Sequence, residues 1–130
     1  MRRANFRFLI SFTLIATAFL SGGPAHAEPT SPIRALYITD YSNFWHDYQK
    51  QGTELQTGIS QYANLEWTLV GKDPDDARKL MRQPNFATQY DVVVYNMCFA
   101  DDSDLEQIDN TIAQTRDLGV PAVLLHCTMH

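Results

Sequence analysis

The hydrophobic pattern of the chain alternates between two periods. Runs that are apolar at most positions are typical of strands covered on both faces, and they lie at residues 33–39 (IRALYIT), 64–70 (NLEWTLV), 90–96 (YDVVVYN) and 120–125 (VPAVLL). The segments between them, at 46–62, 73–82 and 103–119, have the spacing or the end signals of helices. This β-α-β-α-β-α-β order predicts an α/β fold with a parallel sheet and helices on both faces.

Sequence features indicate the buried face of the first predicted helix and the start of the last one. The first has one apolar stripe, formed by Tyr48, Leu55, Ile59 and Tyr62. Gly52 falls on the same stripe and would let this helix approach the sheet closely. The last helix is predicted to begin at a capping box of Ser103 and Glu106, and it carries Leu105, Ile108 and Ile112.

Right-handed crossovers favour the strand order 2-1-3-4 of a flavodoxin-like three-layer sandwich. The chain ends at His130, five residues after the fourth predicted strand, and no helix follows to cover that strand. An open parallel sheet would expose an apolar edge there. We therefore expect residues 33–130 to be the N-terminal portion of a longer α/β domain, truncated after strand four.

The first residues have the pattern of a secretory signal peptide. Three arginines within residues 1–7 precede an uncharged run of 13 residues at 8–20, and Ala25-His26-Ala27 supplies the small-x-small cleavage pattern. The run is shorter than the roughly 20 residues that a spanning helix needs, although an uncleaved anchor is the alternative. We predict a signal peptide at residues 1–27, a lead-in at 28–32, and a secreted or periplasmic mature chain that leaves the membrane after cleavage.

Charge and motif content exclude several function classes. Ten basic residues against 15 acidic ones give a net charge of −5, so no basic surface exists to neutralise phosphates and we expect no nucleic-acid partner. Two cysteines are too few for a disulfide scaffold. Neither a dinucleotide-binding G-x-G-x-x-G nor a P-loop occurs in the sequence, and we expect no cofactor. The sequence leaves the oligomeric state open.

Residues suited to chemistry gather at the ends of the predicted strands. Ligands of open α/β sheets bind beyond the carboxyl ends of the strands, and strands one, three and four are neighbours in the order 2-1-3-4. The candidates on this edge are Asp40, His46, Asn96, Cys98, His126, Cys127 and His130. Histidine and cysteine suit proton transfer, nucleophilic attack and metal binding near neutral pH. We therefore predict a functional site at this edge, with His46 and His126 in one cleft.

Each candidate also has a purely structural interpretation. Asp40 can serve only to hold a turn. Cys98 and Cys127 can be small buried apolar residues, or they can be bridged, because they end adjacent strands. The spacing of His126 and His130 matches a helical zinc pair but lacks the glutamate of H-E-x-x-H and follows a strand. We therefore predict no metal.

Three segments, ALYITDYSNFWHDY, YDVVVYN and VPAVLLHCTMH, resemble the ThuA-like (trehalose utilisation) family, which is similar in fold to class I glutamine amidotransferases. The resemblance covers nearly all of residues 33–130. It implies a histidine after strand one, matched by His46, and one after the later strand, matched by His126. Cys127 falls near the nucleophile of the amidotransferases, but Leu125 and Met129 stand where their G-x-C-x-G elbow has glycines.

The resemblance implies an extracytoplasmic domain that binds or acts on a carbohydrate or a related small polar molecule. His46 and His126 would be acid/base or orienting groups, and Asp40, Asn96 and His130 would contact the ligand. The sequence leaves two alternatives open. One is a cysteine-dependent hydrolase or amidotransferase-like enzyme with Cys127 as nucleophile. The other is a non-catalytic small-molecule or metal-binding module built from His46, His126, His130 and Cys127.

Overall fold

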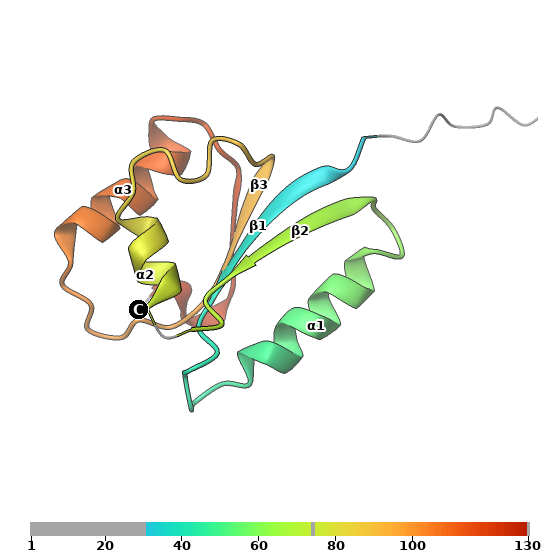
Figure 1. Ribbon diagram of the computed structural model, residues 1–130, viewed down its shortest axis with the longest axis horizontal. Helices are drawn as coiled ribbons and strands as arrows, with labels where there is room; N and C mark the ends of the chain where they lie inside the picture. Colours follow the sequence, from blue (N-terminus) through green and yellow to red (C-terminus); the bar gives the residue numbers. More distant parts are fainter. Residues whose placement is uncertain (1–30, 74, 130) are drawn as a thin grey trace, which may run out of the picture.

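Four parallel strands form one sheet in the order β2-β1-β3-β4 (Figure 1), which confirms the predicted fold class and strand order. The computed structural model of the chain describes residues 31–73 and 75–129, with the backbone alone at His126 and Met129. The elements are β1 (Ile33–Thr39), α1 (Tyr48–Ile59), β2 (Leu65–Val70), α2 (Asp76–Met81), β3 (Val92–Asn96), α3 (Leu105–Arg116), β4 (Ala122–Leu124) and the 3-10 turn η1 (His126–Met129). The predicted signal peptide and lead-in lie almost wholly outside these residues.

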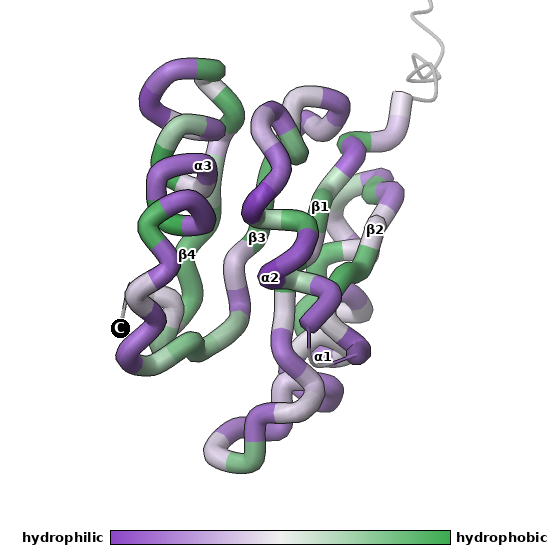
Figure 2. Tube along the Cα trace, turned by 60° about the vertical axis from the view of Figure 1, so that its left-hand side comes forward, coloured by the Kyte–Doolittle hydropathy of each residue, from purple (hydrophilic) through white to green (hydrophobic). Residues whose placement is uncertain are grey.

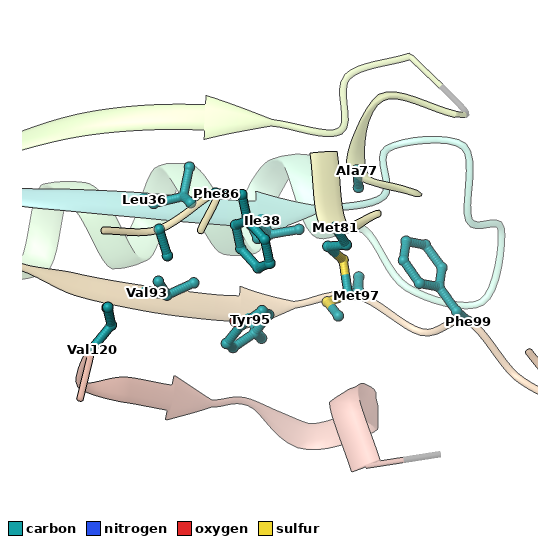
Figure 3. Packing of buried hydrophobic residues seen from close by; sticks show 11 residues of the cluster. Leu36, Ile38, Ala77, Met81, Phe86, Val93, Tyr95, Met97, Phe99 and Val120 are labelled. Carbon is teal, nitrogen blue, oxygen red and sulfur yellow. The ribbon is translucent and has the colours of Figure 1, made fainter. Parts of the chain in front are cut away.

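The helices divide between the two faces of the sheet. Figure 1 shows α1 on one side of the strands and α2 and α3 on the other. The core between the sheet and α2 is formed by alternate residues of β1 and β3, namely Leu36, Ile38, Val93 and Tyr95, which meet Ala77 and Met81 of α2 (Figure 3). Burial of these apolar side chains stabilises the sheet on this face.

On the other face, α1 lies close to β1 because it carries a glycine at the contact. A Cβ atom at Gly52 would lie 3.1 Å from ring atoms of Tyr37, which is itself buried and stacks edge-on against Trp67 at 5.6 Å between ring centroids. The predicted glycine contact is therefore present. The predicted stripe extends too far, since α1 ends at Ile59 and Tyr62 lies beyond it with 90% of its surface exposed.

The start of α3 differs from the predicted capping box of Ser103 and Glu106. The N-cap residue is Asp104, whose carboxylate accepts a hydrogen bond from the Gln107 backbone N–H at 3.2 Å. Asp104 and Gln107 have the same three-residue spacing as the predicted pair, and the carboxylate also binds the guanidinium of Arg82. A charged acceptor at the positive end of a helix is favoured over a neutral hydroxyl.

The buried positions of α3 are two amides rather than leucine and isoleucine. Gln107 and Gln114 are 3% and 1% exposed, whereas Leu105 is 72% exposed. Burial of Gln114 is possible because both polar atoms of its side chain are hydrogen-bonded. Oε1 accepts from the Ala87 N–H at 3.1 Å, and Nε2 donates to the Asn110 carbonyl at 2.9 Å. The hydrogen bond to Ala87 therefore holds α3 to the loop between α2 and β3.

The turn after β1 is fixed by a glycine with a left-handed backbone. Gly71 has a φ of +110°, and a Cβ atom there would lie 1.8 Å from the Thr39 carbonyl oxygen. Its own carbonyl accepts a hydrogen bond from the Tyr41 N–H at 2.9 Å. Because only glycine tolerates this approach, the end of β2 clamps the loop that leads to α1.

Strand β4 is shorter than predicted and lies at an edge of the described sheet. Figure 2 shows its hydrophobic stretch next to α3. Val123 and Leu124 are 44% and 54% exposed, as expected for an apolar strand that is incompletely covered. Within the described residues, no helix combines the length and apolar character needed to cross a bilayer.

Candidate functional site at the carboxyl ends of the strands

Three chain segments meet where β1, β3 and β4 end. The backbone of β4 joins β3 through the Leu125 N–H, which donates to the Tyr95 carbonyl at 3.0 Å. The hydroxyl of Thr128 in η1 donates to the same carbonyl at 2.9 Å. The loop after β1 reaches across to this point, because the Asn43 amide donates to the Cys98 carbonyl at 3.4 Å. These bonds hold residues that are distant in sequence at one edge of the sheet.

His46 and Cys127 are in contact at this edge. The imidazole Nε2 lies 3.1 Å from the Cys127 sulfur, although the two residues are 81 positions apart in sequence. His46 is partly exposed, and Cys127 is buried at 8% exposure. The His46 ring also lies 5.3 Å from the ring of Tyr48, the first residue of α1. The imidazole is therefore held between η1 and the start of α1.

The surroundings of Cys127 keep its thiol protonated near neutral pH. Burial raises the pKa of the Cys127 thiol, and a hydrogen bond and charge repulsion from the Cys98 thiol raise it further. The Tyr48 hydroxyl acts in the opposite direction on this pKa. The His46 Nε2 lies within hydrogen-bonding distance of the Cys127 sulfur, and the tautomer of the imidazole determines which of the two donates.

Tyr48 is the second buried group beside the thiols. Burial raises the pKa of its hydroxyl well above the usual range, and Cys127, Cys98 and Asp40 raise that pKa further. Its hydroxyl has no hydrogen-bond partner of regular geometry in the described part of the chain. Tyr48 therefore stays neutral and packs the site without supplying a charge.

An open cleft of about 710 Å³ begins at His46 and runs along α1. It is lined by His46, Gln51, Glu54, Leu55, Asn96 and Leu125. Asn96, the last residue of β3, is 3% exposed, and its amide donates to the Tyr37 hydroxyl at 2.6 Å and to Gln51 Oε1 at 3.2 Å. The cleft thus offers amide, carboxylate and imidazole groups over two apolar side chains.

The predicted site residues do not all reach this cleft. His46 and Asn96 line it, and Cys127 contacts His46. Asp40 instead holds the turn after β1, where its carboxylate accepts from the backbone N–H and the hydroxyl of Ser42. His126 begins η1, but its side chain and the whole of His130 lie outside the described residues.

Gln51 and Glu54 were not among the predicted site residues. They come from α1 rather than from a strand end, so the rule that selected the other candidates does not include them. Their position in the sequence was the signal that could have identified them. Gln51 and Glu54 directly precede Gly52 and Leu55, which belong to the stripe predicted to face the sheet.

The described residues contain no group of three or more histidine, cysteine, aspartate or glutamate side chains placed to hold a metal ion. His46 and Cys127 alone supply two such ligands, fewer than the three or four protein ligands of ordinary zinc sites. No disulfide joins Cys98 and Cys127 in this structure.

Comparison with known proteins adds no family, so the fold alone defines the class of protein. The all-parallel sheet of order 2-1-3-4 is consistent with flavodoxin-like and class I glutamine amidotransferase-like folds. No protein-family model, no curated protein and no solved structure matches the chain.

Proposed function

We propose that this chain is an extracytoplasmic ThuA-like domain that binds or acts on a small polar molecule of the carbohydrate type in the cleft beside His46. The observation that carries the proposal is the meeting of His46 and Asn96 with Gln51 in one open cleft. Imidazole, amide and carboxylate groups are the partners that sugar hydroxyls use, and Leu55 and Leu125 offer apolar surface to the C–H face of a ring.

The contact between His46 and Cys127 gives the thiol a positioning role in this proposal. Through its 3.1 Å contact with Nε2, the buried thiol holds the orientation of the imidazole. His46 then meets a ligand hydroxyl as a hydrogen-bonding or acid/base group in a defined orientation. Asn96 is held by Tyr37 and in turn orients Gln51, so the amide side of the cleft is also preorganised.

Calorimetric titration of the full-length chain with trehalose and with glucose tests this proposal. We expect saturable binding that His46→Ala and Gln51→Ala each weaken at least about tenfold, which corresponds to about 1.4 kcal/mol. Gln49→Ala is the matched control, because Gln49 is an exposed glutamine of α1 that does not line the cleft. Absence of binding to either sugar, or equal losses in the Gln49→Ala control, would contradict the proposal.

A second candidate function is a cysteine-dependent hydrolase, and the 3.1 Å contact between the His46 nitrogen and the Cys127 sulfur favours it. In such an enzyme His46 takes the thiol proton as the sulfur attacks a carbonyl carbon. Burial of Cys127 and the bulky Leu125 and Met129 beside it oppose this reading. Hydrolysis of amide or ester substrates that Cys127→Ser and thiol alkylation both abolish would establish the hydrolase; sugar binding that Cys127→Ser retains would favour the first proposal.

A further inference from the structure

The two cysteines of the chain occupy equivalent positions after paired strands. Tyr95 of β3 is in register with Leu124 of β4, and each cysteine follows its paired residue by three positions. Thr128 draws η1 back onto the Tyr95 carbonyl. As a result Cys98 and Cys127 follow neighbouring strand ends, and the Cys98 thiol is close enough to raise the pKa of the Cys127 thiol.

The two thiols differ in access and in their neighbours. Cys98 is partly exposed, and Cys127 is buried. Cys127 also has a base close to its sulfur, because the His46 Nε2 lies 3.1 Å away. The arrangement therefore combines an accessible thiol, a shielded thiol and a proton acceptor, which are the parts that thiol–disulfide exchange requires.

We propose that Cys98 and Cys127 form a dithiol site that reacts with low-molecular-weight disulfides, with Cys98 as the entry thiol, Cys127 as the resolving thiol and His46 as its base. In the first step the Cys98 thiolate, its proton lost to water, attacks one sulfur of the disulfide RS–SR. The S–S bond breaks, one RS⁻ leaves and takes up a proton, and a mixed disulfide remains on Cys98.

In the second step Cys127 gives its proton to His46 and attacks the Cys98 sulfur. The bond between Cys98 and the bound SR group breaks, and the second RS⁻ leaves with the proton that His46 held. The net reaction oxidises the two protein thiols to one disulfide by two electrons and reduces RS–SR to two RSH. Because the His46 Nε2 lies 3.1 Å from the Cys127 sulfur, removal of His46 should slow the second step. The first step gives its proton to water and should be unchanged.

The test uses oxidised glutathione on the full-length chain, with acid quenching, alkylation and intact-mass measurement over time. We expect the wild-type chain to lose both thiols and retain no glutathione. Cys127→Ser should accumulate one stable glutathione adduct, and Cys98→Ser should react at least about tenfold more slowly than wild type. His46→Ala should accumulate the mixed disulfide and convert it to the internal disulfide at least about tenfold more slowly.

A parallel reaction in urea separates the folded arrangement from ordinary thiol reactivity. Unfolding should abolish the differences between Cys98→Ser and Cys127→Ser and between His46→Ala and wild type. The proposal fails if the folded wild-type chain keeps a stable glutathione adduct, if folded Cys98→Ser reacts as fast as wild type, or if His46→Ala resolves the mixed disulfide at the wild-type rate. These readouts involve no sugar, so they are independent of the proposed function.

Discussion

At the scale of single residues, the cleft depends on a close contact between α1 and β1. Gly52 leaves room for the ring of Tyr37, whose hydroxyl accepts a hydrogen bond from Asn96. Tyr37 is 2% exposed and is held between this hydrogen bond and Trp67. It therefore has little freedom to move if a larger residue replaces the glycine.

Substitution of the two glycines of α1 should have opposite effects. Gly52→Ala places a methyl group 3.1 Å from Tyr37, and the cost of this crowding should exceed the gain in helix propensity by about 1 kcal/mol. Gly58→Ala meets no atom within 4 Å and should stabilise the chain by about 0.5–1 kcal/mol. Urea unfolding midpoints measure both, and a stabilised Gly52→Ala chain would show that the contact is loose.

At the residue scale, the sequence offered one rule for choosing candidate site residues, which was their position at the carboxyl ends of the strands. Asn96 was selected as the end of a strand and His46 as the start of the helix after one, and both line the cleft. Gln51 and Glu54 could not be selected in this way, since the angle at which a helix crosses a sheet determines which of its polar residues face a cleft. The hydrogen bonds by which Asp40 holds its turn could not be predicted either, because the same residues are compatible with more than one turn conformation.

At the scale of elements, the first residue of α3 depends on which of two adjacent side chains accepts a hydrogen bond from the first turn of the helix. Ser103 and Asp104 each stand three residues before a glutamate or glutamine, so the capping pattern alone does not choose between them. The structure selects Asp104, where the carboxylate gains both the Gln107 N–H and the Arg82 guanidinium. This tertiary ion pair has no counterpart in the local pattern.

Substitution of Ser103 and of Asp104 should show which of them caps the start of α3. Asp104→Ala should lower the free energy of unfolding by about 1 kcal/mol through loss of the cap, whereas Ser103→Ala should change it by less than about 0.5 kcal/mol. Asp104→Asn keeps a capping oxygen and removes the charge, so it should lie between the two. Thermal unfolding followed by circular dichroism measures the differences; equal losses at Ser103 and Asp104 would contradict the assigned cap.

The start of β3 is joined to β1 by an ion pair that predicts a dependence on pH. The Asp91 carboxylate accepts from the Arg34 guanidinium and from its backbone N–H at 2.8 Å each. These hydrogen bonds lower the pKa of Asp91 from 3.8 to about 2. A carboxyl whose pKa is lower in the folded state stabilises that state above its unfolded pKa, and this contribution is lost as the pH falls through the folded pKa.

The stability that Asp91 contributes should therefore decline between about pH 4 and pH 2. Denaturant unfolding of wild type and Asp91→Asn at several pH values isolates this contribution from that of the other carboxylates. We expect a wild-type advantage at pH 6 that shrinks steadily toward pH 2. A difference that stays constant over this range would show that the ion pair is absent in solution.

At the scale of the whole molecule, the sequence was sufficient to predict the strand order of the sheet. The residues of β1 agree with prediction at both ends, and the alternation of strands and helices led to the observed order 2-1-3-4. The predicted β4 is longer than the observed Ala122–Leu124. Pro121 and the limited cover over Val123 and Leu124 explain this difference, because strand length depends on neighbours that a local pattern does not contain.

The export signal is a further prediction at this scale, and it concerns residues outside the described part of the chain. Arginines, a 13-residue apolar run and Ala25-His26-Ala27 predict cleavage after Ala27. N-terminal sequencing of the exported protein should begin at Glu28. Recovery of a mature protein that still begins at Met1 would contradict this prediction.

The most direct test of the cleft is an NMR titration of the isotope-labelled full-length chain with trehalose. We expect saturable shifts of the Gln51 and Asn96 side-chain amides and of the Glu54 and Leu55 backbone amides, because these residues line one cleft with His46. The exposed Gln49 side-chain amide should not move. Saturable shifts confined to residues outside the cleft, or no saturable shift at any trehalose concentration that stays in solution, would contradict the proposed function.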